Sequence, residues 1–68
     1  MAQPTPTPPV TGAERKVLLW LQRGLSNRAI ASELVLSPRT VESHIAHLLG
    51  KTGCHNRTQL LLWALAER

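Results

Sequence analysis

The sequence predicts an all-α domain of four short helices, the second and third of which form a helix-turn-helix. After residue 10, apolar residues recur at helical spacing, and no stretch shows the pattern typical of a strand. A residue that can cap a helix stands before each of the four segments. Only three residues separate the second segment from the third, which allows only a sharp turn between two packed helices.

The chain is small, and its core must be aliphatic. Its 68 residues hold one domain, and a chain of this size buries only about 60% of its unfolded surface. The hydrophobic fraction of 43% is enough for a core, but Trp20 and Trp63 are the only aromatic residues. An enzyme is the least expected class, because no nucleophile, base and orienting group stand together and no phosphate loop is present. We expect no cofactor.

The charge balance favours a polyanionic partner or an acidic membrane surface. Lysine and arginine outnumber the acidic residues eight to four, which gives a formal charge of +4. Charge alone is equally consistent with a mildly basic domain that has no such partner. The single cysteine, Cys54, cannot form an internal disulfide, and there is neither a secretory signal nor an apolar run long enough to span a bilayer. These features predict a cytoplasmic protein.

The first ten residues, "MAQPTPTPPV", predict a flexible tether. They carry four of the five prolines with threonines between them and no charged side chain. Such a composition favours extended, solvated chain over a packed core. The tether could be the end of a linker in a longer parent or the natural start of a free-standing protein. The folded domain is expected to span residues 11–68.

The first helix is expected to begin at Thr11. Thr11 and Glu14 form the pattern of a capping box, which satisfies the free amides of a helix start. Gly24 should end the helix, because glycine readily adopts positive φ. Leu19 lies off the apolar stripe, where it could contact a parent domain. The stripe itself consists of Val17, Leu18, Trp20 and Leu21.

The second helix should run from Asn27 to Leu34, with Ser26 as its N-cap. A helix of barely two turns is marginal alone and needs neighbours. Residues 35–37 then form the tight connection to the third helix. The side chains expected to face inward are Ile30, Ala31 and Leu34.

The third helix is expected over residues 38–51. The Ser37 hydroxyl can cap it, and Pro38 suits the first helical position, where its missing N–H would be unpaired anyway. The segment from Gly50 to Gly53 marks its end. Its buried stripe should be Val41, Ile45, Leu48 and Leu49. The opposite stripe, which carries no lysine, consists of Arg39, Glu42, Ser43, Ala46, His47 and Gly50.

The fourth helix should follow Asn56, which forms a second capping box with Gln59. The residues able to pack inward are Leu60, Leu61, Ala64 and Leu65. The other side would carry Leu62, Trp63 and Ala66. Two apolar faces on one short helix need two partners, unless Trp63 folds back over the domain edge.

Several side chains of the metal-ligating type lie in this part of the chain, but we expect no metal site. They are His44, His47, Cys54 and His55. Cys54 is better explained as a core residue. Up to this point, a DNA-binding module and a helical bundle without nucleic-acid binding both fit the helix-turn-helix pattern.

From residue 10 onward, the sequence resembles the LuxR-type (GerE-like) helix-turn-helix domain of bacterial transcription regulators. The matching pieces, in order, are Thr11 and Glu14 before "VL", "GLSN" before "IA", Leu34, a serine followed two residues later by "RTV", His44, Leu48, Lys51, Gly53 and "RTQ" at 57–59. The resemblance implies a tri-helical DNA-binding core, whose third helix enters the major groove, and a C-terminal helix that dimerises. It also implies no metal, and a place at the C-terminal end of a longer regulator with an N-terminal regulatory domain.

The resemblance assigns contact residues by position. The residues expected to contact base edges are Glu42, Ser43, Ala46 and His47. Arg39 and Thr40, near the start of the third helix, are expected close to the DNA backbone, as is the Ser37 cap. The cations able to neutralise phosphate add Arg23, Arg28, Lys51 and Arg57 to the expected backbone contacts. The dimer contacts are expected at Leu62, Trp63 and Ala66. The chain departs from the family at Ala13, Lys16 and Thr52 without consequence for the fold.

Glu42 is the departure that bears on function, because many members carry a lysine there. A carboxylate on the reading helix lends some support to a protein-interaction module that has lost DNA binding. A second alternative is the promoter-reading domain of sigma factors, which shares the "IA…L…S…TV" pattern. "GLSN" and "RTQ" favour the LuxR type over that domain.

Overall fold

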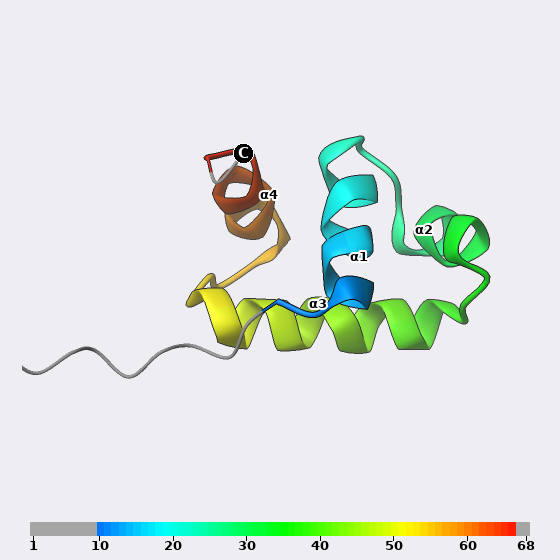
Figure 1. Cartoon of the computed structure of the whole chain (residues 1–68). Coiled ribbons are helices and arrows are strands. Elements are labelled where there is room, and N and C mark those ends of the chain that lie inside the picture. Colours follow the sequence, from blue (N-terminus) through cyan, green and yellow to red (C-terminus); the bar gives the residue numbers. More distant parts are fainter. Residues whose placement is uncertain (1–9, 67–68) are drawn as a thin grey trace, which may run out of the picture.

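A computed structural model describes residues 10–66 of the chain. It contains α1 (Gly12–Gln22), α2 (Asn27–Leu34), α3 (Pro38–Thr52) and α4 (Arg57–Ala66), and no strand in the described range. The predicted all-α fold of four short helices is therefore confirmed (Figure 1). Of the predicted tether, residues 1–9 lie outside the described residues, and Val10 packs against the core.

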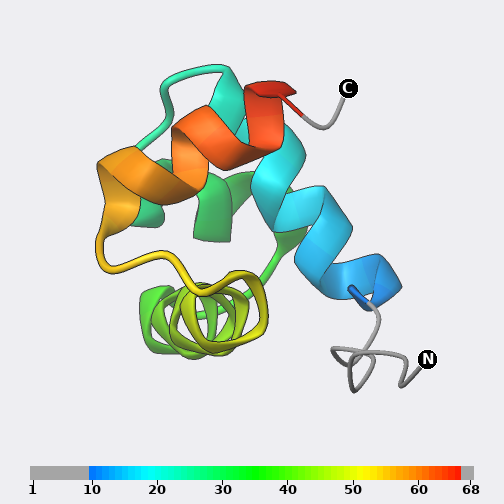
Figure 2. The same cartoon turned by 90° about the vertical axis from the view of Figure 1, so that its left-hand side faces the viewer.

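The longest helix, α3, lies along one side of the domain. The other three helices all stand on the same side of α3, as both Figure 1 and the perpendicular view in Figure 2 show. The contacts agree, because α1, α2 and α4 each pack against α3. Consequently one full face of α3 is covered by no other helix of the described chain.

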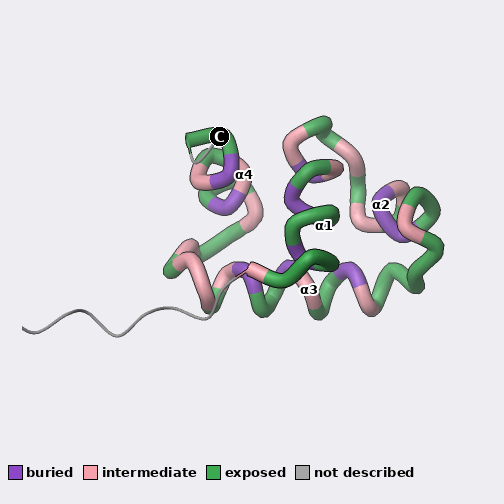
Figure 3. Tube along the Cα trace, in the orientation of Figure 1, coloured by how far each residue is buried: buried purple, intermediate pink, exposed green. Residues whose placement is uncertain are grey.

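The core is aliphatic, as predicted. It is built from one stripe of each helix, and neither tryptophan is fully buried (Figure 3). Its members are Val17, Leu18, Leu21, Ile30, Ala31, Val41, Ile45, Leu48, Leu60 and Ala64. Trp20, Leu34, Leu49 and Cys54, which were expected inside, are half-buried and pack against this cluster from its edge.

The predicted helix starts are confirmed by their hydrogen bonds. The Thr11 hydroxyl accepts from the Glu14 amide at 3.1 Å, while the Glu14 carboxylate accepts from the Thr11 amide at 3.0 Å. Ser26 caps α2 by accepting from the Ala29 amide. At the end of α1, Gly24 has φ +84°, as a left-handed cap requires.

The second predicted capping box is only half correct. The Asn56 side chain accepts from the Gln59 amide at 2.9 Å. The Gln59 carboxamide, however, accepts at 2.7 Å from the amide of His55 rather than from that of Asn56. The chain bends at Asn56 before α4 begins, and it is the His55 amide that comes within reach of Gln59.

The predicted orientation of α4 was wrong for two side chains. Leu65 was expected inside but is 40% exposed, whereas Trp63 was expected outside and packs partly against the core. The buried face is centred on Leu60 and Ala64. At 3.6 residues per turn, Trp63 lies about 60° and Leu65 about 140° from Leu60 around the helix axis. The large indole therefore reaches the core edge, and Leu65 does not.

The turn between α2 and α3 holds a strained residue that the sequence did not reveal. Val35 adopts a left-handed conformation with φ 56° and ψ 49°, and its side chain is 90% exposed. The Leu36 amide donates to the Ala31 carbonyl at 2.9 Å. This hydrogen bond ends α2 and directs the chain toward the start of α3. The left-handed conformation is sterically strained for a β-branched residue such as valine.

Replacing Val35 by asparagine is expected to raise the free energy of unfolding by about 1 kcal/mol. Asparagine tolerates the left-handed region, and almost no buried apolar surface is lost because Val35 is exposed. Urea denaturation followed by circular dichroism measures the change. Val35→Thr is the matched control, since it keeps the β-branch and should leave stability nearly unchanged. An equal gain in both variants would show that strain is not the cause.

Candidate nucleic-acid interface

The uncovered face of α3 carries the residues that the sequence placed there. Val41, Ile45 and Leu48 are buried on the opposite side of the helix. All members of the predicted outward stripe are exposed, namely Arg39, Glu42, Ser43, Ala46, His47 and Gly50. We call this set the outward face of α3. It is continuous, polar or small in character, and open to a large partner.

The N-terminus of α3 is organised by two hydroxyl groups. Ser37 caps the helix by accepting from the Thr40 amide at 3.1 Å, and the hydroxyls of Ser37 and Thr40 share a hydrogen bond of 2.9 Å. No acidic residue lies in the first turn of α3. Arg39 is exposed between these two hydroxyls in the sequence, at the positive end of the helix dipole. This end of α3 is therefore suited to an anion.

The N-terminus of α2 offers a second positive position. Ser26 caps the helix, and Arg28 is exposed in its first turn, which also lacks an acidic residue. α2 packs against α3 as the other half of the helix-turn-helix. Arg28 and Arg39 are thus exposed cations in the first turns of two neighbouring helices.

Lys51, predicted as a contact to the DNA backbone, forms an ion pair within the domain. Its ammonium contacts the Glu14 carboxylate at 2.6 Å, with the two side chains only 18% and 4% exposed. The ion pair joins the last turn of α3 to the first turn of α1. Burial by itself raises the pKa of Glu14, but the hydrogen bonds from Lys51 and Thr11 and the charge of Lys51 bring it below its ordinary value of 4.5.

The sequence did contain a signal for this ion pair. Glu14 precedes Val17 by three residues, Leu18 by four and Leu21 by seven, so it continues the buried stripe of α1. A carboxylate on a buried stripe requires a charged or hydrogen-bonding partner. Which cation supplies it could not be read from the sequence, because Lys51 is 37 residues away.

Arg57 also forms a contact within the domain. Its guanidinium donates to the Asn27 side chain at 2.5 Å and to the Leu25 carbonyl at 2.6 Å. These bonds fasten the start of α4 to the segment that leads into α2. Arg23 lies at the end of α1 that is farther from α3, with its guanidinium 5.2 Å from the centre of the Trp20 ring (Figure 1). Neither residue lies on the outward face of α3.

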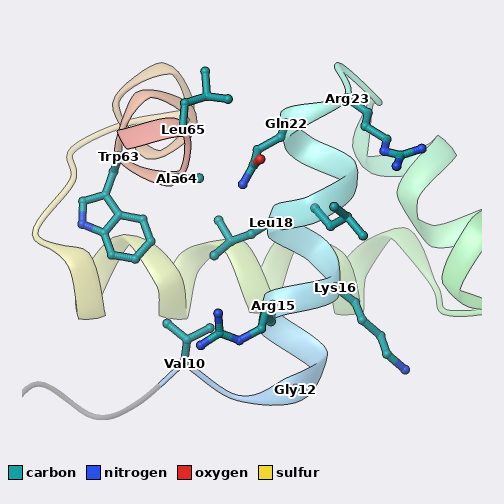
Figure 4. A pocket seen from close by; sticks show the side chains of 11 residues that line it. Val10, Gly12, Arg15, Lys16, Leu18, Gln22, Arg23, Trp63, Ala64 and Leu65 are labelled. Atoms are coloured by element: carbon teal, nitrogen blue, oxygen red, sulfur yellow. The ribbon is translucent and has the colours of Figure 1, made fainter. Parts of the chain in front are cut away.

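The predicted dimer residues fall on two sides of α4. Leu62 is 61% exposed and Ala66 is exposed as well. Trp63 is half-buried and packs against the core, and its indole faces the Leu18 side chain of α1 (Figure 4). Leu62 and Ala66, which are one turn apart, therefore form the freely accessible part of the predicted contact.

Other kinds of site have little support in the described chain. Between residues 10 and 66, no three histidine, cysteine or acidic side chains gather closely enough to hold a metal ion. No helix in that range is both long enough and apolar enough to cross a lipid bilayer.

Comparison with known proteins gives one family. The family described as bacterial regulatory proteins, luxR family, matches residues 9–64. An HTH-type transcriptional regulator of Mycobacterium bovis is 44% identical over 52 residues, covering 76% of this chain and 6% of the relative. A response regulator of Synechocystis is 41% identical over 64 residues, covering 90% and 28%. Fimbriae Z protein of Salmonella typhimurium is 38% identical over 56 residues, covering 82% and 27%. The chain thus spans less than a third of each relative.

Proposed function

Because this chain belongs to the luxR family of bacterial regulatory proteins and is a DNA-binding domain of a transcription regulator, we propose that α3 enters the major groove of double-stranded DNA. The observation that carries the proposal is the outward face of α3, whose residues are all exposed and which no other described helix covers. A helix of this kind fits the width of the major groove. The family is one of regulators rather than enzymes.

The outward face supplies the groups for base readout. Glu42 can accept from the amino group of cytosine, and Ser43 can donate or accept. The Ala46 methyl, one turn further on, can contact a thymine methyl. His47 lies beside it and can donate or accept through its ring nitrogens. Each good contact of this kind is worth about 1 to 3 kcal/mol of discrimination between bases.

Phosphate contacts are proposed at the starts of the two helices of the helix-turn-helix. Arg39 and Arg28 are exposed there, the helix amides are close by, and Ser37 and Thr40 add hydroxyl groups. For Lys51 and Arg57 we propose a supporting role, since both hold contacts within the domain. Arg23 lies too far along α1 from α3 to belong to the same surface.

We further propose that two copies bind DNA together through α4. Leu62 and Ala66 leave an apolar strip exposed on this helix. A twofold contact through this strip would place two α3 helices on half-sites about one helical turn of DNA apart. The longer relatives support a regulatory domain elsewhere in a parent chain. DNA binding also supports a cytoplasmic location.

Fluorescence anisotropy with labelled duplexes of varied sequence, at two salt concentrations, tests the proposal. We expect affinity to depend on both sequence and salt, and two chains to bind each palindromic duplex. With the Leu62→Glu variant, only one chain should bind each duplex, because the α4 contact between the two copies is broken. Equal affinity for all duplexes would rule out base readout, and unchanged pairing of Leu62→Glu would rule out the α4 contact.

A further inference from the structure

A second surface lies across α1 and α4, away from the outward face of α3. Residues of both helices line a groove there (Figure 4). We call it the α1–α4 face, and the residues that matter are Arg15, Lys16, Leu19, Arg23, Trp63 and Leu65. In Figures 1 and 2, α1 and α4 stand on the side of α3 opposite its uncovered face. DNA binding through α3 does not explain this surface.

The α1–α4 face contains exposed apolar groups. Leu19 is 47% and Leu65 40% exposed. The Trp63 indole extends from α4, and Leu18 points toward it from α1 (Figure 4). Exposed apolar groups that gather on one face mark a protein contact, and tryptophan is among the residues that supply most of the binding energy at such contacts.

The same face is positively charged. Arg15 extends from α1 on the side of α4, while Lys16 and Arg23 extend on the other side of α1 (Figure 4). No residue lining the groove is acidic. Of the carboxylates within residues 10–66, Glu14 is buried in its ion pair, while Glu33 belongs to α2 and Glu42 to the outward face of α3. Among residues 10–66, therefore, cations flank the apolar groups and no carboxylate lies on the face to balance them.

We propose that the α1–α4 face binds an acidic amphipathic helix of a partner protein. The apolar side of that helix would cover Leu19, Trp63 and Leu65, and its carboxylates would pair with Arg15, Lys16 and Arg23. A phosphodiester backbone would match the cations, but it would leave the two leucines and the indole exposed. The combination of charge and apolar surface therefore favours a protein segment over a second nucleic-acid site.

The test uses a synthetic helical peptide of about 18 residues, or five turns, with a leucine stripe flanked by glutamates. It is titrated into the ¹⁵N-labelled chain and followed by amide and indole chemical shifts. We expect shifts in residues 15–23 and at the Trp63 indole. The same peptide with glutamine in place of each glutamate should bind at least tenfold more weakly. Saturating duplex DNA should leave the affinity unchanged, because the proposed base contacts lie on the outward face of α3 and not on the α1–α4 face.

Two protein variants distinguish local charge pairing from an effect of overall charge, because both lower the net charge by the same amount. Arg15→Gln/Lys16→Gln removes two cations from the α1–α4 face and should weaken binding about tenfold. Ser32→Glu/Thr58→Glu changes the net charge equally at exposed positions outside this face and should have less than a twofold effect. Equal loss in both variants, shifts confined to residues 39–47, or no binding would each overturn the proposal. None of these results would affect DNA binding by α3.

Discussion

Replacing Glu14 by alanine is expected to lower the free energy of unfolding by about 3 kcal/mol. The substitution removes the carboxylate that lies 2.6 Å from the Lys51 ammonium in a nearly solvent-free position. It also removes the acceptor of the Thr11 amide at the start of α1. A domain of this size has a total stability of only about 3 to 9 kcal/mol. The loss is therefore a third or more of the total, and urea denaturation should show a clearly lower midpoint for the variant.

Glu14→Gln is the matched control for the charge. Glutamine can keep both bonds of the capping box but cannot form the ion pair, so its stability should lie between those of the parent and of Glu14→Ala. If Glu14→Ala cost less than about 1 kcal/mol, the pair would be no more than an ordinary surface contact.

The same ion pair predicts how stability depends on pH. The pKa of Glu14 is lower in the folded chain than its ordinary value of 4.5. The stabilisation is therefore complete above that value and is lost as the pH falls below it toward the folded pKa. Glu14→Gln should remove this part of the acid dependence. If the free energies of unfolding of the parent and of Glu14→Gln fell in parallel below pH 4.5, the ion pair would not be the source of this acid dependence.

Arg39→Ala is expected to weaken binding to every duplex about tenfold and to reduce the salt slope by about 0.9. Arg39 is exposed in the first turn of α3, where a phosphate contact would carry no base information. Glu42→Ala should act in the opposite direction on nonspecific DNA. If α3 enters the groove, the substitution removes a carboxylate that would lie near negative phosphates and one acceptor for cytosine, so affinity for nonspecific DNA should rise while base preference relaxes.

The two variants control for each other, since both replace a charged side chain on the same exposed face by alanine. Anisotropy titrations against a panel of duplexes, repeated over a range of salt concentrations, give both quantities. A Glu42→Ala variant with an unchanged ranking of duplexes would exclude Glu42 as a base contact. An Arg39→Ala variant that loses affinity for one sequence alone would assign Arg39 to base readout instead.

Local signals in the sequence were sufficient for the helices and for the outward face of α3. The start of each of the first three helices could be predicted from its N-cap, which is Thr11, Ser26 or Ser37. Each cap accepts from an amide only three residues further along the chain. The spacing of Val41, Ile45 and Leu48 fixes which side of α3 is buried, and hence which side is exposed. These features depend only on the 3.6-residue period of a helix.

Tertiary contacts and unusual backbone angles could not be predicted from such local signals in the sequence. Lys51 and Arg57 were predicted as backbone contacts because of their charge, and their partners within the domain, 37 and about 30 residues away in the sequence, were not foreseen. Long flexible side chains can reach several neighbours, and no spacing rule selects among them. Val35 was missed because a valine gives no hint of positive φ. Trp63 was misplaced because α4 is apolar on nearly every side.

The most direct test of the central claim is an NMR titration of the ¹⁵N-labelled chain with a palindromic DNA duplex. If α3 reads the major groove, the amides of residues 39–47 and the first turn of α2 should shift together and lose their shifts at high salt, while residues 15–23 of α1 remain unchanged. If duplex DNA leaves residues 39–47 unmoved and only α4 responds as protein concentration rises, α3 does not bind DNA and the claim is wrong.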